Sequence, residues 1–165
     1  LFLERGTGKS INLINDIIAK TSYEDFIIKK KKNCRSKDFL YKLEIGGITY
    51  IDEFDYKFKT QVLPIEKFEI NKKDRFIKCF DYDKIIGSLY IRNRKDGDRF
   101  IPYGMSGSKK IKDYFIDEKI PREVRDTIPL ITDEENILWV VSYRRSDLCK
   151  ITDVTKTVLK IEFVK

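Results

Sequence analysis

The side chains best suited to chemistry in this sequence are basic and lie in the segment 92–112. This segment carries seven Lys and Arg residues against two Asp residues. Charged Lys and Arg donors bind phosphate groups, and phosphate contacts dominate the affinity of proteins for nucleic acids. The segment therefore predicts a surface for a polyanion. The alternative is a solvated basic helix end that binds nothing.

A glycine-bearing loop in this segment, Gly104 to Ser108, is predicted to lead into a helix. Three apolar residues would share the inward face of that helix: Ile111, Tyr114 and Phe115. We expect Lys109 and Lys110 in its first turn, where free N–H groups and the helix dipole favour an anion and disfavour a cation. Cations at such a position cost stability, which is typical of residues that serve function.

Nine residues are predicted to contact the nucleic acid: Arg92, Arg94, Arg99, Ser108, Lys109, Lys110, Lys112, Arg122 and Arg125. The last two lie in a second short helix that Pro121 opens. These two residues, like Arg144 and Arg145, could extend the positive surface or equally well pair with acids, which are Glu123, Asp126 or Asp147. Asp96 and Asp98 flank Gly97, so we expect them to serve the turn and to orient Arg94 or Arg99 rather than to catalyse.

Other kinds of site are disfavoured. The chain has no His and three widely spaced Cys residues, which argues against a Cys/His zinc site and against His-based catalysis. Unpaired cysteines fit a reducing, cytoplasmic compartment, and no apolar run is long enough for a membrane span. The stretch Gly6–Ser10 resembles a phosphate loop, but Leu3 stands where that motif needs its first glycine.

The elements that must position these residues indicate an α+β fold of mostly antiparallel sheets with two short helices. Residues 1–87 form a strand-rich region, in which Gly46-Gly47 predicts a hairpin turn. Residues 88–165 form a second module, although the two could pack as one unit. The net charge of +7 favours a polyanionic partner or a basic but ordinary protein about equally. The start at Leu1, without Met, is typical of an excised piece of a longer protein.

Three stretches carry a family resemblance: RNRKDGDRF at 92–100, GMSGSKKIKDYFI at 104–116 and EKIPR at 118–122. Together with Trp139 and its neighbours, the pattern over residues 88–163 resembles the C-terminal domain of bacterial tRNA(Ile)-lysidine synthetases. The first 87 residues match only loosely. Asp96 replaces a commonly small or Pro-like residue, and Ser108 stands where Thr is frequent; both keep the chemistry of a turn or cap.

This resemblance implies a fold similar to a domain of the phenylalanyl-tRNA synthetase β subunit. It also implies a parent ligase that uses ATP and Mg to attach lysine to the wobble cytidine of tRNA(Ile). The chemistry would belong to an N-terminal catalytic domain acting in cis, so we expect no catalytic residue, metal or cofactor here. The nine residues would bind the tRNA body, chiefly its acceptor stem. The alternatives are a structural or homodimer-forming domain that packs on the catalytic domain, and a stand-alone RNA-binding module.

Overall fold

The computed structural model describes residues 10–12, 17–22, 25–30, 38–68 and 74–164. The chain divides into two compact units, residues 1–37 and residues 38–165. The sequence suggested a boundary at 87/88 instead. The two units divide earlier because strands from 38–87 pair with strands from 88–165 in both sheets of the larger unit.

The smaller unit is an antiparallel sheet of three strands in the order β1-β2-β3. Its strands are β1 (Ser10–Asn12), β2 (Ile17–Ser22) and β3 (Asp25–Lys30). The strand-rich character expected of residues 1–87 is therefore confirmed in this unit. Residues 6–9 of the stretch resembling a phosphate loop lie outside the described residues, but Ser10 begins a strand, whereas a phosphate loop leads into a helix.

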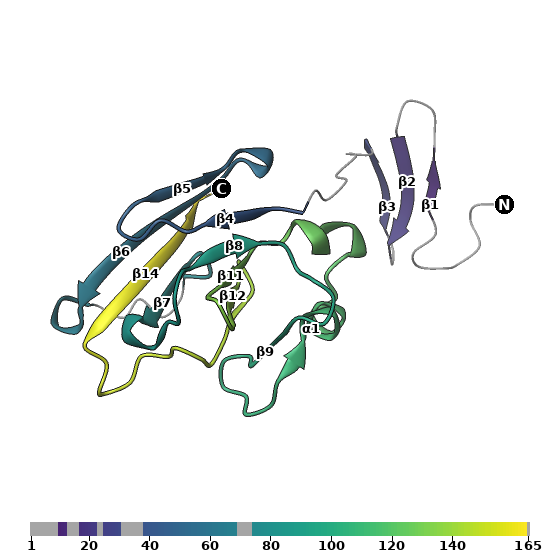
Figure 1. Cartoon of the computed structure of the whole chain (residues 1–165). Helices are drawn as coiled ribbons and strands as arrows, with labels where there is room; N and C mark the ends of the chain where they lie inside the picture. Colours follow the sequence, from purple (N-terminus) through teal and green to yellow (C-terminus); the bar gives the residue numbers. More distant parts are fainter. Residues whose placement is uncertain (1–9, 13–16, 23–24, 31–37, 69–73, 165) are drawn as a thin grey trace. The chain divides into compact units, whose positions relative to one another are not determined.

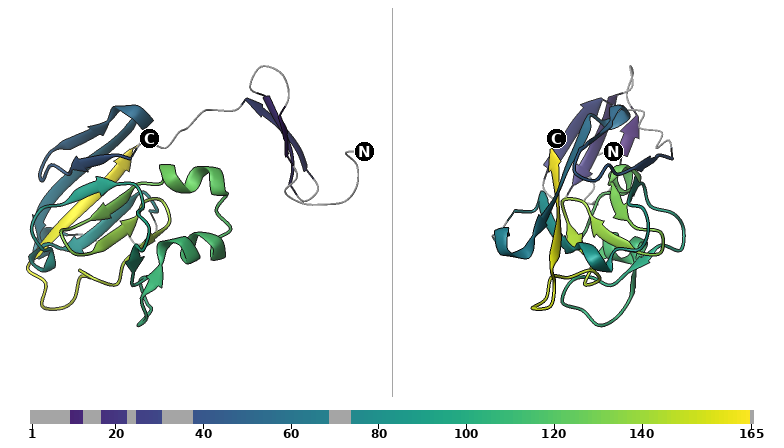
Figure 2. Two further views of the ribbon diagram at one scale, coloured as in Figure 1. Left: turned by 45° about the vertical axis from the view of Figure 1, so that its right-hand side comes forward. Right: turned by 60° about the vertical axis from the view of Figure 1, so that its left-hand side comes forward.

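The larger unit contains two main antiparallel sheets, visible in Figure 1. The first has the order β5-β6-β14-β7, with β5 (Ile48–Ile51), β6 (Tyr56–Pro64), β14 (Thr157–Val164) and β7 (Ile77–Asp81). The second has the order β13-β12-β11-β8-β4, with β13 (Arg144–Arg145), β12 (Ile137–Val140), β11 (Leu130–Thr132), β8 (Tyr90–Arg92) and β4 (Leu40–Lys42). The closing strand β14 runs between β6 and β7 (Figure 2).

Four short 3₁₀ helices join these strands: η1 (Asp52–Phe54), η2 (Ile65–Lys67), η3 (Tyr82–Lys84) and η4 (Arg122–Thr127). The one α-helix among the described residues is α1 (Ile111–Asp117), preceded by a two-stranded ribbon of β9 (Arg99–Phe100) and β10 (Lys109–Lys110). None of these helices is long and apolar enough to cross a bilayer.

The main core lies between the two sheets. Alternate residues of β14, Leu159, Ile161 and Phe163, point into it, as the period-2 pattern predicts. From the other sheet come Ile91 and Trp139, and the indole of Trp139 is fully buried. Trp139 is thus a core residue, whereas nearby Tyr143 is 40% exposed.

A second core lies on the opposite face of the five-stranded sheet. Ile111, Tyr114 and Phe115 of α1 pack there against Leu130 and Val140. The inward face predicted for the helix is therefore confirmed. Because β12 is covered on both faces, all four of its residues are buried, a pattern that antiparallel strands with one wet face do not show. This second core fixes the position of α1 and of the ribbon before it.

The predicted hairpin at Gly46-Gly47 is wrong. The chain does turn there, and Gly46 adopts a positive φ of 74°. However, β4 before the turn pairs with β8, whereas β5 after it pairs with β6. The turn therefore carries the chain from one sheet to the other. A two-glycine turn specifies a local reversal, but which sheet each strand joins depends on residues far away in the sequence.

Candidate nucleic-acid interface

The β9–β10 ribbon carries two cations that face each other. Arg99 and Lys110 are direct cross-strand partners, and side chains in such positions lie about 5 Å apart at Cβ. Arg99 donates from Nε to Ser108 Oγ (2.7 Å) and from Nη2 to the Ser108 carbonyl (3.0 Å). Like charges in this arrangement cost stability. Neither residue forms an ion pair in the described part of the chain.

The helix begins later than the sequence predicted. Lys109 and Lys110 belong to β10, and Lys110 is the N-cap residue of α1, with extended backbone. The first turn instead contains Lys112 and Asp113. The prediction of two lysines in the first turn is therefore wrong, because pairing with β9 holds both residues in a strand. With seven residues, α1 is also too short to attract an anion strongly, so any attraction at this site would have to come from side-chain charge.

The two arginines of the preceding strand region are bound to carboxylates. Arg92 and Asp98 form a two-pronged ion pair with N···O distances of 2.7 and 2.9 Å, and each side chain is only 13% exposed. Arg94 lies 2.7 Å from Asp126 of η4 and 3.9 Å from Asp96. Asp98 thus orients Arg92, and of the two acids expected to orient Arg94 or Arg99 it is Asp96 that lies near Arg94. Both arginines tie the 93–98 turn to the sheet and to η4.

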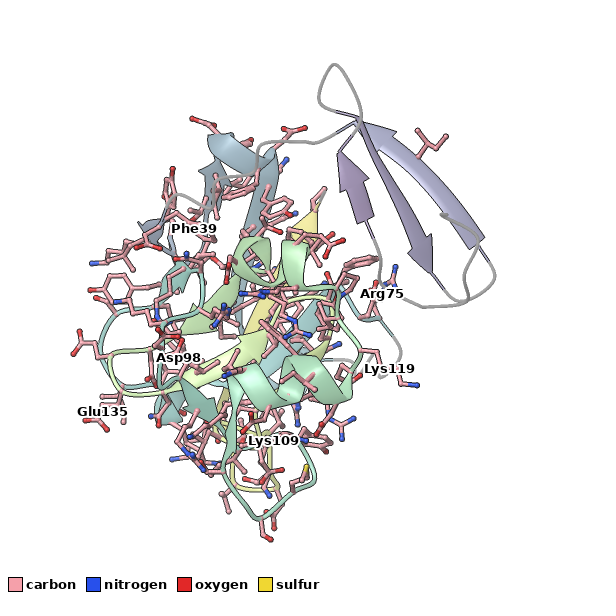
Figure 3. The ribbon with its side chains drawn as sticks, turned by 90° about the vertical axis from the view of Figure 1, so that its right-hand side faces the viewer. Phe39, Arg75, Asp98, Lys109, Lys119 and Glu135 are labelled. Carbon is pink, nitrogen blue, oxygen red and sulfur yellow. The ribbon has the colours of Figure 1, made fainter. Side chains whose placement is uncertain are left out.

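Lys109 also has an acidic partner. Its Nζ is hydrogen-bonded to Asp117 at the end of α1. Figure 3 shows Lys109 beside α1 and Lys119 just beyond the end of that helix. There Lys119 has a positive φ of 53°, and the N–H of buried Ile120 donates to the Phe115 carbonyl (2.9 Å), which closes the helix in the manner usual for Gly at this position.

Of the nine predicted residues, Ser108 accepts hydrogen bonds from Arg99, and the eight cations fall into two sets. In η4, Arg125 donates from Nε to the Ile120 carbonyl (2.9 Å), and Arg122 is exposed. The first set consists of cations bound to carboxylates: Arg92, Arg94 and Lys109. The second set consists of cations that form no ion pair among the described residues: Arg99, Lys110, Lys112, Arg122 and Arg125. We call Arg99, Lys110, Lys112 and Arg122, which are all exposed, the open cations.

Sequence reasoning missed the role of Tyr103, in the loop between β9 and β10. Its N–H donates to the Arg145 carbonyl (2.9 Å), and the Arg145 guanidinium stacks 4.0 Å from its ring centroid. Its carbonyl accepts a hydrogen bond from Arg144 Nη2 (3.0 Å). In the sequence, the feature that could have indicated this role is a Tyr in a glycine-bearing loop between two basic strands. Arg144 and Arg145 themselves contact this loop, and the charge of Arg145 also acts on the Asp147 carboxylate.

Two ionisable groups near the loop have shifted pKa values. Hydrogen bonds from Lys150 and from the Gly104 N–H lower the pKa of the Asp147 carboxyl. Asp147 is therefore ionised when it accepts the hydrogen bond from the loop backbone at Gly104. Burial raises the pKa of the Tyr114 hydroxyl, and nearby Glu118 adds to this effect. Tyr114 thus stays neutral in the core under α1.

Comparisons with known proteins agree with this architecture. Residues 89–161 match the family model described as "TilS substrate C-terminal domain". The chain carries a TilS C-terminal domain. A crystal structure of a TilS C-terminal domain aligns with a TM-score of 0.67, at 24% identity, over 77% of this chain and 96% of that one. The shared fold confirms the α+β class, with antiparallel sheets and few helices.

The likeness to curated tRNA(Ile)-lysidine synthases covers nearly the whole chain. A tRNA(Ile)-lysidine synthase of Caldanaerobacter subterraneus subsp. tengcongensis is 45% identical over 163 residues, which are 99% of this chain and 35% of that protein. One from Clostridium perfringens is 42% identical, over 97% of this chain and 36% of its own length. The chain thus spans about 35% of the curated relatives it matches. Residues 1–87, which matched only loosely by motif, are included.

Proposed function

We propose that this chain is the tRNA-binding part of a tRNA(Ile)-lysidine synthase and that the open cations contact the tRNA. One observation carries the proposal: Arg99 and Lys110 face each other across the ribbon without an acidic partner in the described part of the chain. A domain that served stability alone would gain from a carboxylate there. An RNA phosphate supplies the missing negative charge.

The shape of an RNA stem suits these residues. A-form helices are bound mainly through phosphates and 2′-hydroxyls rather than through base edges. Long, exposed Lys and Arg side chains can reach such groups without a pocket. The paired cations, Arg92, Arg94 and Lys109, have a different role in this proposal: they hold the turn, η4 and α1 in place, so that the open cations keep a fixed arrangement.

The whole protein would join lysine to the wobble cytidine of tRNA(Ile) with ATP and Mg, and that chemistry would belong to a catalytic domain acting in cis. This part would hold the acceptor stem while the catalytic domain works on the anticodon. Its own residues would then bind and orient the substrate in the cytoplasm without taking part in bond formation.

The test is a titration of the isolated chain with an isoleucine tRNA and with a minihelix of its acceptor stem, at two salt concentrations. If about four phosphates are neutralised, a fourfold rise in salt weakens binding roughly 100-fold. Similar affinity for both RNAs would support acceptor-stem binding, whereas binding of the tRNA alone would place the contact elsewhere. A chain that binds neither RNA and self-associates would instead support the structural role.

A further inference from the structure

The ring of Tyr103 is held rigidly and yet remains 45% exposed. On either side of it, the backbone of the loop is bonded to the 144–147 segment: Tyr103 N–H to the Arg145 carbonyl, and Gly104 N–H to Asp147 Oδ1 (3.1 Å). The bridge between Pro102 and Ser146 continues this pairing. An exposed aromatic ring on a well-fixed backbone loses little conformational entropy when a ligand covers it.

One face of the ring is already covered by a cation. The Arg145 guanidinium lies 4.0 Å from the ring centroid and is itself fixed by a 2.9 Å hydrogen bond to the Cys79 carbonyl. This stack orients the ring, and 45% of the residue remains exposed to solvent beside it. Exposed Met105 (47%) follows in the same loop and adds a soft, apolar neighbour.

The loop also connects the two strands of the proposed RNA contact. Arg99 stands at its start, in β9, and Lys110 stands just after its end, in β10. The loop that carries Tyr103 therefore belongs to the same β9–β10 element as the two cations proposed to bind the RNA stem. Aromatic rings beside basic side chains are the usual platform on which unpaired bases stack, and Arg next to such a ring adds a cation–π contribution.

We propose that Tyr103, backed by Arg145, is a stacking site for an unpaired nucleobase that adjoins the RNA stem. The ligand class is a single-stranded nucleotide of any base, because every base offers a π face and no base-reading hydrogen bond is required. This inference rests on the proposed function, since the open cations must first bring the RNA to the loop.

The experiment compares a blunt RNA hairpin with the same hairpin carrying a short single-stranded 3′ tail. Wild-type chain should bind the tailed hairpin more tightly, and Tyr103→Ala should lose about 5- to 100-fold for the tailed hairpin while binding the blunt one unchanged. Tyr103→Phe should keep the wild-type preference, because stacking needs the ring and not the hydroxyl. A tail with abasic sites should lose its advantage.

The matched control is Tyr50→Ala. Tyr50 is also an exposed tyrosine (57%) with a cation, Lys57 Nζ, 5.7 Å from its ring, but it lies on β5. Its loss should affect neither hairpin. An equal effect of Tyr103→Ala on both hairpins, or a Tyr103→Phe as weak as Tyr103→Ala, overturns the stacking site and leaves the proposed function standing. If the wild type binds neither hairpin, both proposals fail.

Discussion

Arg92 and Asp98 hold each other through two parallel hydrogen bonds, of 2.7 and 2.9 Å, across the turn that separates β8 from β9. Asp98 Oδ2 accepts a third bond, from the Lys95 N–H (2.7 Å), and the Asp98 carbonyl accepts one from Ile111 at the start of α1 (2.9 Å). One carboxylic residue thus joins a strand, a turn and a helix. Arg92, which the sequence predicts to contact RNA, thus holds the scaffold that carries the cations proposed to bind it.

Asp98→Ala should destabilise the domain by about 2–3 kcal/mol, because it leaves the mostly buried Arg92 charge without its partner and removes charge-assisted hydrogen bonds. Urea denaturation measures this as a lower midpoint. Asp96→Ala is the control, since the Asp96 side chain is fully exposed and lies 3.9 Å from Arg94, farther than Asp98 lies from Arg92. Equal stability of the two variants would show that the Arg92–Asp98 pair does not hold the turn.

Lys110→Glu combined with Lys112→Glu should weaken tRNA binding at least 10-fold and flatten its salt dependence, because two attractive contacts become repulsive. The control is Lys67→Glu with Lys156→Glu, an equal change of charge at exposed residues beside the four-stranded sheet. Filter binding at two salt concentrations measures both. If the control pair lowers affinity as much as the test pair, net charge and not the ribbon governs binding.

Lys109→Ala should change tRNA affinity much less than Lys110→Ala, although the residues are neighbours. The Lys109 ammonium is engaged with Asp117, whereas Lys110 faces Arg99. The Lys109–Asp117 pair is partly exposed, so its loss should cost under about 1 kcal/mol of stability. Gel-shift titrations of the two single variants compare them directly. An equal loss of tRNA affinity in Lys109→Ala and Lys110→Ala would show that the Lys109–Asp117 contact does not persist in solution.

Asp81 should make the domain less stable in acid. Burial acts to raise the pKa of this carboxyl, but hydrogen bonds from Lys84 (2.7 Å) and Thr155 (2.6 Å) outweigh it, so the pKa lies below its usual value of 3.8. A lowered pKa stabilises the fold above about pH 4, and this contribution disappears as the pH falls through the folded-state value.

Asp81→Asn tests this sign. The variant should be less stable than the wild type near neutral pH, and the difference in unfolding free energy should shrink as the pH falls from about 4 through the lowered pKa of the folded-state carboxyl. Denaturation series across the acid range provide the measurement. A constant difference between the two proteins at every pH would mean that the Asp81 charge contributes nothing to stability.

Much of the fold could be predicted because the spacing of apolar residues along the sequence indicates which face of each strand or helix is buried. Leu159, Ile161 and Phe163 alternate with polar residues and form the inward face of β14, while Ile111, Tyr114 and Phe115 follow the helical period and cover the sheet. Strand partners were harder to predict. Nothing near Gly46 in the sequence indicates that β4 pairs with β8, about fifty residues later.

The sequence by itself determined the strand and helix periods, the family and the excess of basic residues between Arg92 and Lys112. Only the tertiary structure decided which of those cations remain open, because an ion pair depends on where distant carboxylates lie. Asp126 reaches Arg94, and Asp117 reaches Lys109, only after η4 and α1 pack on the sheet. Charge is a local property of the chain, whereas its neutralisation is a property of the folded protein.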